Sequence, residues 1–317
     1  MSASVHGDAT TPEVSVVMPC FNGERYLEEA IRSVLDQTLR EVELIVVDDG
    51  SKDSSPAIVA RLQQVYGDRL VGVAQPNAGP YAARNRGLQM ARGRFVAFLD
   101  SDDWWAPDCL QKLHAALVAD DGAALAYCGW QNIGLEGGRG APYVPPDYEL
   151  EDKAARFLRA AAPWPIHAAL VRRSVMREVG LFDLDLPTCM DYDLWLRIGV
   201  ARRIRLVPEV LAFYRHHQSG QITSTQWRQA RNSWLVKRAR RPRRRRAAAA
   251  RLRQFLASRP GFRAAHLPAV AAPRRLGPEG PGLPAAGAVA GAAVPQGRAE
   301  PGPLTMSLYA SVIAAPA

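Results

Sequence analysis

Three aspartates within four positions, Asp100, Asp102 and Asp103, are the residues of this chain that most directly indicate chemistry. They follow the apolar run from Phe95 to Leu99, whose aromatic and branched side chains predict a short buried strand. Side chains two positions apart on an extended backbone point the same way, so Asp100 and Asp102 can face one site. Paired carboxylates suit Mg²⁺ or Mn²⁺ held together with substrate phosphates. The alternative is a solvated turn that caps the helix expected near Pro107.

The elements that position these aspartates alternate between apolar strands and amphipathic helices. Apolar runs predict further strands at 14–18, 42–47 and 70–73, and helical spacing predicts helices at 24–37, 55–66 and 81–91. This alternation predicts an α/β fold with a doubly wound, mostly parallel sheet flanked by helices. Ligands bind such sheets at the carboxyl ends of the strands. Polar turn-forming clusters follow three of these strands, so we expect them to share one site.

The motifs, in this order, resemble the glycosyltransferase family 2 pattern of GT-A fold enzymes. The resemblance covers about residues 12 to 225 and rests on segments 14–22, 46–51, 77–79, 82–87, 98–103, 191–197 and 214–217. It implies an inverting hexosyltransferase-like enzyme that moves a sugar from a nucleotide diphosphate to an acceptor hydroxyl. We expect a UDP- or dTDP-sugar donor and a glycan or lipid-linked acceptor, in the synthesis of a surface polysaccharide or glycolipid.

The resemblance also implies which residues bind the donor. Pro19 and Phe21 match positions that line the nucleobase and ribose pocket, and Asp48 matches the carboxylate that accepts hydrogen bonds from the base. Arg84 would flank the diphosphate, where a guanidinium binds phosphate oxygens in a forked geometry. The alternatives are a strand-end turn for Asp48 and a solvated helix face for Arg84. The full donor-binding set that we expect is Pro19, Phe21, Asp48, Asp49, Arg84 and Ser101.

Asp100 and Asp102 match the metal-binding Asp-x-Asp of the family, so the resemblance implies Mn²⁺ or Mg²⁺ as cofactor. The metal would stabilise the negative charge that builds on the leaving diphosphate. His217 matches a position that approaches the metal or the diphosphate, with an ordinary surface histidine as the alternative. Trp104 and Trp105 either stack on a sugar or fill the core between the two halves, and we favour the core.

Asp191 matches the catalytic base that deprotonates the acceptor hydroxyl. The alternative is a first-turn acid that stabilises the helix expected at 191–200. Met190 stands where the family usually carries a glutamate, and this departure leaves Asp193 as a rival base. We favour Asp191, because two positions along a helix Asp193 would face elsewhere.

The basic charge of the chain is concentrated in its last part. The formal net charge is +9, yet residues 228–317 contain only two acids, Glu279 and Glu300. The Arg-rich run 237–246 could sit on anionic lipid head groups, have no partner, or bind nucleic acid non-specifically, and we rank these in that order. We expect no specific binding of a nucleic acid. Composition beyond Arg253 predicts a disordered tail, and it also matches translation of a shifted reading frame.

The domain organisation that we predict is a GT-A domain at 12–227 and a basic tail at 228–317. Residues 12–105 would form the nucleotide and metal half, and residues 106–227 the acceptor and base half. Four cysteines without Cys-x-x-Cys spacing predict free thiols. The chain has neither an apolar leader nor a run of about 18 apolar residues. We therefore expect a cytoplasmic protein, with peripheral contact at the inner face of the plasma membrane.

Two other functions compete with this interpretation. A nucleotidyltransferase of the same fold would carry a Gly-rich phosphate loop with a following basic residue after the first strand, and residues 19–23 lack one. A non-catalytic sugar-nucleotide-binding protein would account for Met190 and for the altered tail. Donor turnover separates this binding protein from an enzyme.

Overall fold

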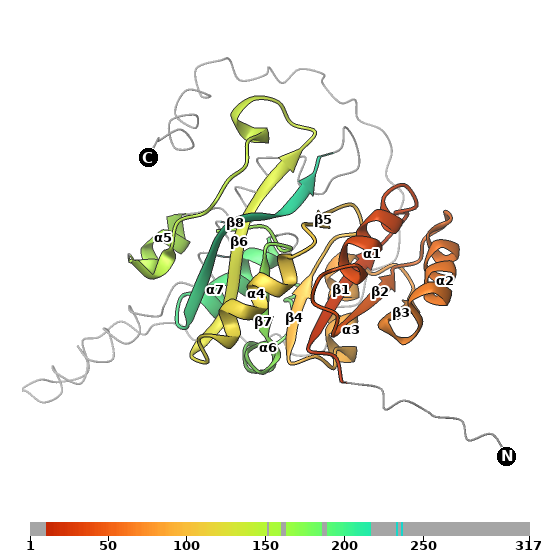
Figure 1. Cartoon of the computed structure of the whole chain (residues 1–317), viewed down its shortest axis with the longest axis horizontal. Coiled ribbons are helices and arrows are strands. Elements are labelled where there is room, and N and C mark those ends of the chain that lie inside the picture. The colour runs from red at the N-terminus through yellow and green to blue at the C-terminus, as the bar shows by residue number, and fades with distance from the viewer. Residues whose placement is uncertain are drawn as a thin grey trace, which may run out of the picture. The chain divides into compact units, whose positions relative to one another are not determined.

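The computed structural model describes residues 11–150, 152–159, 163–185, 189–216, 233 and 236 (Figure 1). The strands of this part form one eight-stranded sheet in the order β3-β2-β1-β4-β7-β6-β8-β5. The first four are parallel to one another and β6 is parallel to β8, whereas β7 and β5 run antiparallel to their neighbours. The predicted α/β fold with a mostly parallel sheet is confirmed.

The first half of the chain builds the parallel strands by regular strand–helix alternation. Every residue of its first strand is buried, as expected for a parallel strand covered on both faces. The five apolar residues that recur at helical spacing in the first helix are all buried against the sheet. The elements are β1 (Val14–Cys20), α1 (Leu27–Leu35), β2 (Val42–Asp48), α2 (Ser55–Tyr66), a 3₁₀ turn (Gly67–Arg69), β3 (Leu70–Ala74), α3 (Pro80–Met90) and β4 (Phe95–Phe98).

The second half extends the same sheet. The short antiparallel strand β7 lies between β4 and β6 and joins the two halves. The elements are β5 (Trp104–Trp105), α4 (Cys109–Val118), β6 (Ala123–Ile133), 3₁₀ turns (Gly137–Gly140 and Tyr148–Leu150), α5 (Lys153–Arg159), β7 (Ala169–Arg172), α6 (Arg173–Val179), α7 (Met190–Gly199) and β8 (Arg203–Arg215).

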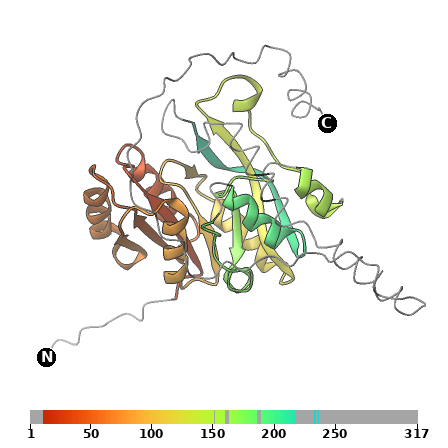
Figure 2. The same cartoon turned by 180° about the vertical axis from the view of Figure 1, so that it is seen from behind.

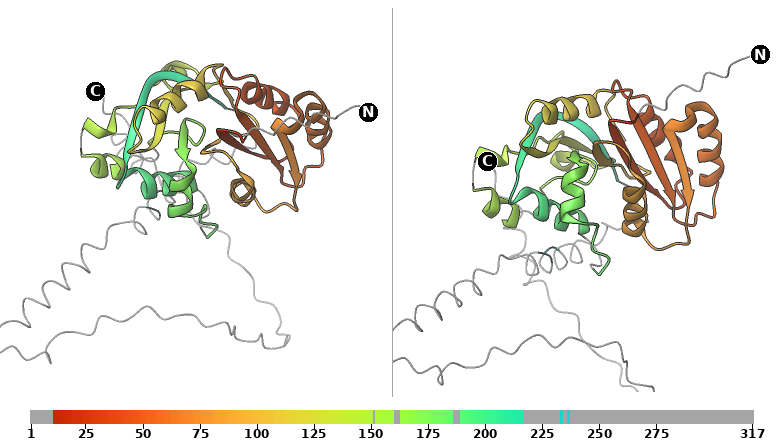
Figure 3. Two further views of the ribbon diagram at one scale, coloured as in Figure 1. Left: turned by 60° about the horizontal axis from the view of Figure 1, so that its bottom comes forward. Right: turned by 90° about the horizontal axis from the view of Figure 1, so that it is seen from below.

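Helices cover both faces of the sheet. Figures 1 and 3 show α1 and α4 on one face, and Figures 2 and 3 show α3, α6 and α7 on the other. Helix α3 packs especially close: a Cβ added at Gly87 would lie 2.4 Å from Val17 Cγ1 and 3.3 Å from Val47 Cγ2. Glycine at this position therefore lets α3 approach β1 and β2, and this contact fixes the helix that carries Arg84.

Three further expectations concern the chain as a whole. All four cysteines are buried free thiols, as predicted. No helix within the described part of the chain combines the length and the apolar character that a membrane crossing requires. His217 and nearly all of the 228–317 tail lie outside the described residues, so their expected properties and the domain boundaries stay predictions.

Candidate functional site

The loops that follow β1 and β2 are joined by reciprocal hydrogen bonds. The Asn22 amide donates to Ser51 Oγ (2.9 Å), and the Lys52 amide donates to Asn22 Oδ1 (2.8 Å). Asn22 has a φ of 52°, a left-handed conformation that asparagine tolerates better than most residues. The Gly23 amide donates in turn to Ser55 Oγ (2.9 Å). The two loops therefore behave as one unit at the carboxyl edge of the parallel strands.

This unit brings together three residues expected at the nucleobase. Pro19 is buried in β1, and Phe21 directly after the strand is 51% exposed. Asp48 ends β2 in register with Cys20, so it lies beside the same loop. One oxygen of Asp48 accepts the Ser51 amide (3.1 Å), so the turn role considered for this residue is present in the structure. The half-exposed ring of Phe21 is free to stack on a planar base.

Asp49 has a different environment from its neighbour. It is 2% exposed, and its Oδ1 accepts hydrogen bonds from Gln75 Nε2 (2.7 Å) and the Ala78 amide (2.9 Å). Its Oδ2 accepts the Gly79 amide (2.8 Å). The carboxylate thus fixes the loop that leads into α3. This geometry supports a positioning role for Asp49 and gives no support to the direct donor contact expected from the sequence.

The acidic turn after β4 lies at the same edge as these loops. The Asp103 amide donates to the Asp100 carbonyl (3.1 Å) and closes the turn, while Asp100, Ser101 and Asp102 are partly exposed. The loop after β1 comes close, because a Cβ added at Gly23 would lie 3.1 Å from Ser101 Oγ. The structure therefore places the expected metal ligands beside the expected nucleobase loop, as sheet topology predicts.

Arg84 of α3 is buried, so the solvated helix face considered for it is wrong. It is 4% exposed, and its Nη2 donates a charge-assisted hydrogen bond to Asp100 Oδ1. Burial disfavours its charged form, but Asp100, Tyr81 and Asp191 together outweigh this effect and raise the pKa of the guanidinium. Its Nε is buried without a hydrogen-bond partner. A fixed cation with an unused donor, next to the acidic turn, is suited to bind a phosphate oxygen.

Asp191 and Asp193 lie in very different surroundings although both are in the first turn of α7. Asp193 is 1% exposed and pairs with Arg197 Nε (2.8 Å), so it anchors the helix rather than facing a cleft. Asp191 is partly exposed, and burial raises the pKa of its carboxyl. The charges of Arg84 and Asp100 also act on this pKa, which places Asp191 near the acidic turn. Geometry therefore favours Asp191 over its rival.

A buried network behind the acidic turn was not anticipated from the sequence. Asp103 Oδ1 accepts the Arg215 amide (2.8 Å), and Arg215 Nε donates to the Asp102 carbonyl (2.9 Å). The Arg215 guanidinium also lies over the rings of Tyr26 (4.1 Å) and Trp104 (4.4 Å). We call Asp103 and Arg215 the β8 clamp, because they fasten the acidic turn to the end of β8.

His167 lies beside Asp103 of the β8 clamp and is fully buried. Its Nδ1 is 3.2 Å from Asp103 Oδ2 without hydrogen-bond geometry, and its ring stacks on Tyr214 (5.6 Å between centroids). Burial lowers the pKa of His167 to about 4, so the ring is neutral at pH 7. Burial, followed by the charges of Asp102 and Asp100, raises the pKa of Asp103 well above its usual range.

The tryptophans after the acidic turn have packing roles. Trp105 is 3% exposed and donates from Nε1 to the His167 carbonyl (2.7 Å). Trp104 stacks on Phe213 with a centroid distance of 5.2 Å and an interplanar angle of 13°. The core role that we favoured is confirmed for Trp105, whereas Trp104 is partly exposed and its predicted core role is not confirmed.

The acidic turn fits a divalent cation that takes most of its ligands from the substrate. Among the described residues, no group of three or more His, Cys, Asp or Glu side chains is arranged to hold a metal ion. Asp100 and Asp102 offer hard oxygen ligands at a partly exposed edge, and Mg²⁺ is commonly bound by one or two carboxylates together with phosphates. His217 lies outside the described residues, so its expected contribution stays a prediction.

Comparison with known proteins agrees with this arrangement. The sequence model described as Glycosyl transferase family 2 matches residues 15–180. The chain is 30% identical over 227 residues to Bacillus subtilis TuaG, a glycosyltransferase whose name refers to teichuronic acid biosynthesis, covering 71% of this chain and 87% of TuaG.

Solved structures show the same fold. S. aureus TarS 1–349 in complex with UDP-GlcNAc matches with a TM-score of 0.56 at 23% identity, over 67% of this chain and 61% of TarS 1–349. The mannosyltransferase PcManGT from Pyrobaculum calidifontis, in complex with GDP-Man and Mn²⁺, also matches with a TM-score of 0.56 at 23% identity, over 74% of this chain and 66% of PcManGT. The chain thus spans less than two thirds of either structure. With its motifs, its sheet and these matches in agreement, the chain belongs to glycosyl transferase family 2.

Proposed function

We propose that this glycosyltransferase uses a nucleoside diphosphate sugar, inverts the anomeric carbon, and takes Asp191 as its base. The observation that carries the proposal is the convergence of Asp191, Arg84 and Asp100, from three separate elements, at the carboxyl edge of the sheet. The charges of Arg84 and Asp100 act on Asp191, which supports assigning the base to Asp191, the phosphate-binding cation to Arg84 and a metal ligand to Asp100.

In the proposed reaction, the oxygen of the acceptor hydroxyl attacks the anomeric carbon, and Asp191 accepts the proton of that hydroxyl. The bond from that carbon to the diphosphate oxygen breaks on the opposite side, and the nucleoside diphosphate leaves with the electron pair. Burial raises the pKa of Asp191 and so makes its ionised form a stronger base. Arg84 would neutralise part of the charge that develops on the diphosphate.

Donor binding in the proposal depends on the residues at the ends of β1, β2 and β4. Phe21 would stack on the base, and Asp48 would accept a hydrogen bond from it. Asp100 and Asp102 would hold Mn²⁺ or Mg²⁺, which acts as a Lewis acid toward the leaving group. The structure of PcManGT contains Mn²⁺, which supports a divalent cation here.

We also propose that the acceptor is a glycan or a lipid-linked glycan of the cell surface. The similarity to the teichuronic acid biosynthesis enzyme TuaG supports this class of acceptor. The site proposed for the acceptor is the second half of the sheet, where Trp130, partly exposed, contacts the 48% exposed Tyr143. Exposed aromatic rings are suited to stack on sugars.

The test is calorimetric binding of UDP, dTDP and GDP to the wild-type chain and to Asp102→Ala, with and without Mn²⁺. We expect Mn²⁺-dependent binding of one nucleotide, lost in Asp102→Ala. The matching nucleotide sugars are then assayed for turnover, and product NMR reads the anomeric configuration. Binding without any turnover would favour the non-catalytic binding protein, and no binding of any nucleotide would contradict the donor site.

A further inference from the structure

A cavity of about 310 Å³ lies at the opposite edge of the sheet from the donor site, and arginines dominate its lining. Its walls are Arg94, Arg172, Arg173, Ser174 and Arg177. Arg94 precedes β4, whereas Asp100 follows that strand. Five residues, Phe95 to Leu99, lie between Arg94 and Asp100, so at the rise of an extended strand the two are separated by about 20 Å. The cavity is therefore separate from the donor site.

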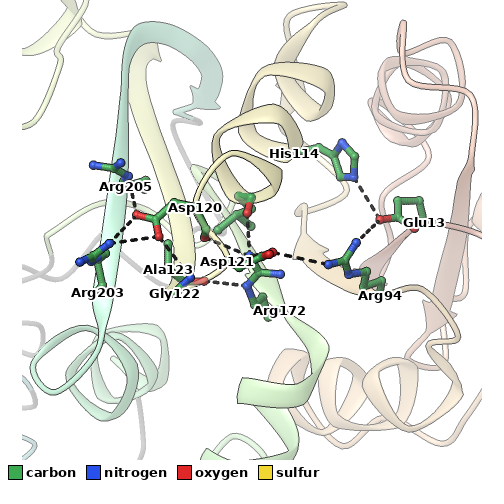
Figure 4. A network of polar contacts seen from close by, with 11 residues as sticks. Glu13, Arg94, His114, Asp120, Asp121, Gly122, Ala123, Arg172, Arg203 and Arg205 are labelled. Carbon is green, nitrogen blue, oxygen red and sulfur yellow. Dashed lines mark hydrogen bonds and ion pairs between the residues drawn. The ribbon is translucent and has the colours of Figure 1, made fainter.

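Carboxylates near the cavity leave part of its positive charge uncompensated. Arg94 lies 3.6 Å from Glu13 and 3.8 Å from Asp121, and Arg172 lies 3.6 Å from Asp121 (Figure 4). Asp121 is 85% exposed, so these long contacts are well screened by water. Within the described part of the chain, no carboxylate pairs with Arg173 or Arg177. The negative charge of the buried Glu43, which pairs with Arg92, also acts on Arg173. Four arginines thus face three acids, of which Glu13 and Asp121 make only long contacts with them.

Three of the four arginines of the cavity wall are held by contacts with the protein, whereas Arg177 is exposed. Arg172 is 12% exposed, and its guanidinium donates to three backbone carbonyls, those of Leu117 (2.6 Å), Ala123 (2.7 Å) and Asp120 (3.1 Å). The Arg94 and Arg172 guanidinium groups lie 5.2 and 5.3 Å from the centre of the buried Phe95 ring. Arg173 donates from Nη1 to the Ala91 carbonyl (3.1 Å). These contacts fix the guanidinium groups of Arg94, Arg172 and Arg173 on the wall of the cavity.

Arg173 and Arg177 repel each other at this site. They are four positions apart on α6, a spacing at which like charges destabilise a helix. Burial, together with the positive charge of Arg177, lowers the pKa of the Arg173 guanidinium. An anion between the two groups would remove this repulsion, and guanidinium groups bind phosphate oxygens in a bidentate manner.

We propose that this cavity binds a phosphate group of a ligand other than the sugar donor. Its volume lies at the lower end of the range of ligand pockets, enough for a phosphate and the group attached to it. The phosphate is that of a phospholipid head group or of a soluble phosphate ester. In either case the ligand anchors at the edge opposite the reacting groups, so it does not compete with the donor.

The test is a calorimetric titration in which inorganic phosphate is added to the full-length protein in a buffer that contains EDTA. The variants are Arg173→Gln/Arg177→Gln, and Arg40→Gln as a control that removes an exposed arginine outside the cavity. We expect the double variant to lose about tenfold or more in affinity for the phosphate site, and Arg40→Gln to bind like wild type. Thermal melting followed by circular dichroism verifies folding.

Arg177→Glu provides a second variant if the double variant does not fold, because Arg177 is exposed on α6. Unchanged phosphate affinity in a folded variant overturns the proposal. Sedimentation with phosphatidylglycerol vesicles then shows whether the bound phosphate belongs to a phospholipid head group or to a soluble phosphate ester. Weaker sedimentation of the double variant than of Arg40→Gln indicates a lipid head group. Equal sedimentation together with lost phosphate affinity indicates a soluble ester.

Discussion

The chemistry of Asp191 is set by where its carboxyl lies rather than by its residue type. Asp193, two positions later, is buried against Arg197, whereas Asp191 remains partly exposed near Arg84 and Asp100. Burial raises the pKa of Asp191, and a base must be ionised to accept a proton. If Asp191 is the base, as proposed, activity is present above this pKa and is lost as the pH falls through it.

An ordinary aspartate has a pKa of about 3.9. Because the pKa of Asp191 is raised, we expect kcat to decline at a higher pH than it would with an ordinary aspartate as the base. Asp191→Asn removes the base and lowers kcat by roughly 100- to 10 000-fold while leaving nucleotide binding in place. The measurement is kcat against pH, with calorimetry for binding. Asp193→Asn is the matched control, expected to lower the Tm and to keep the wild-type pH profile. A changed profile in Asp193→Asn with a normal one in Asp191→Asn would reverse the assignment.

At the scale of elements, the site depends on how the end of β8 is joined to the acidic turn. The β8 clamp gives the Asp102 carbonyl and the Asp103 carboxyl fixed partners on one strand. Arg215 also binds Glu29 Oε2 (2.8 Å) on α1. One arginine therefore connects the acidic turn, the end of the sheet and the helix after the nucleobase loop.

Replacing Arg215 with Met removes these bonds while keeping much of the apolar stem. We expect the Mn²⁺ concentration for half-maximal activity to rise about tenfold, because the acidic turn loses its support. Arg205→Met is the control, since Arg205 lies on the same strand and pairs with Asp120 (2.9 Å), away from the turn. Equal Mn²⁺ dependence in the two variants would show that the clamp does not position the metal ligands.

The elements were readable from the sequence, but the clamp was not. Helical periodicity predicted α2 at its observed bounds, and apolar runs located β1, β2 and β4 within a few residues. The contact between Asp103 and Arg215 joins positions 112 residues apart, and no local pattern links them. Asp49 is a second example. Its sequence motif resembles a donor-binding site, but its burial depends on the tertiary structure, which the local sequence does not reveal.

At the scale of the whole molecule, the sequence run 237–246 carries much of the positive charge. This run lies outside the described residues, so its contribution is argued from its composition. The formal net charge of +9 depends on the tail that contains this run. Basic residues near an anionic membrane contribute about 1 kcal/mol each at moderate ionic strength.

Replacing Arg243, Arg244, Arg245 and Arg246 with Gln is therefore expected to weaken binding to phosphatidylglycerol vesicles at least tenfold. Phosphatidylcholine vesicles serve as the neutral control, and added salt should weaken wild-type binding in the same direction. Vesicle sedimentation measures both effects. Binding that is insensitive to these four substitutions and to salt would exclude an electrostatic role for the tail.

The placement of β7 has a consequence for synthesis on the ribosome. β4, with its fully buried Phe95–Phe98, pairs on one side with β7, which follows about 70 residues later. At roughly 5 to 20 residues per second, a nascent chain carries this unpaired apolar strand for several seconds. Open strand edges template aggregation. We therefore expect the yield of the protein in a cell to depend on translation speed and on chaperones that shield this edge until residue 172 has emerged.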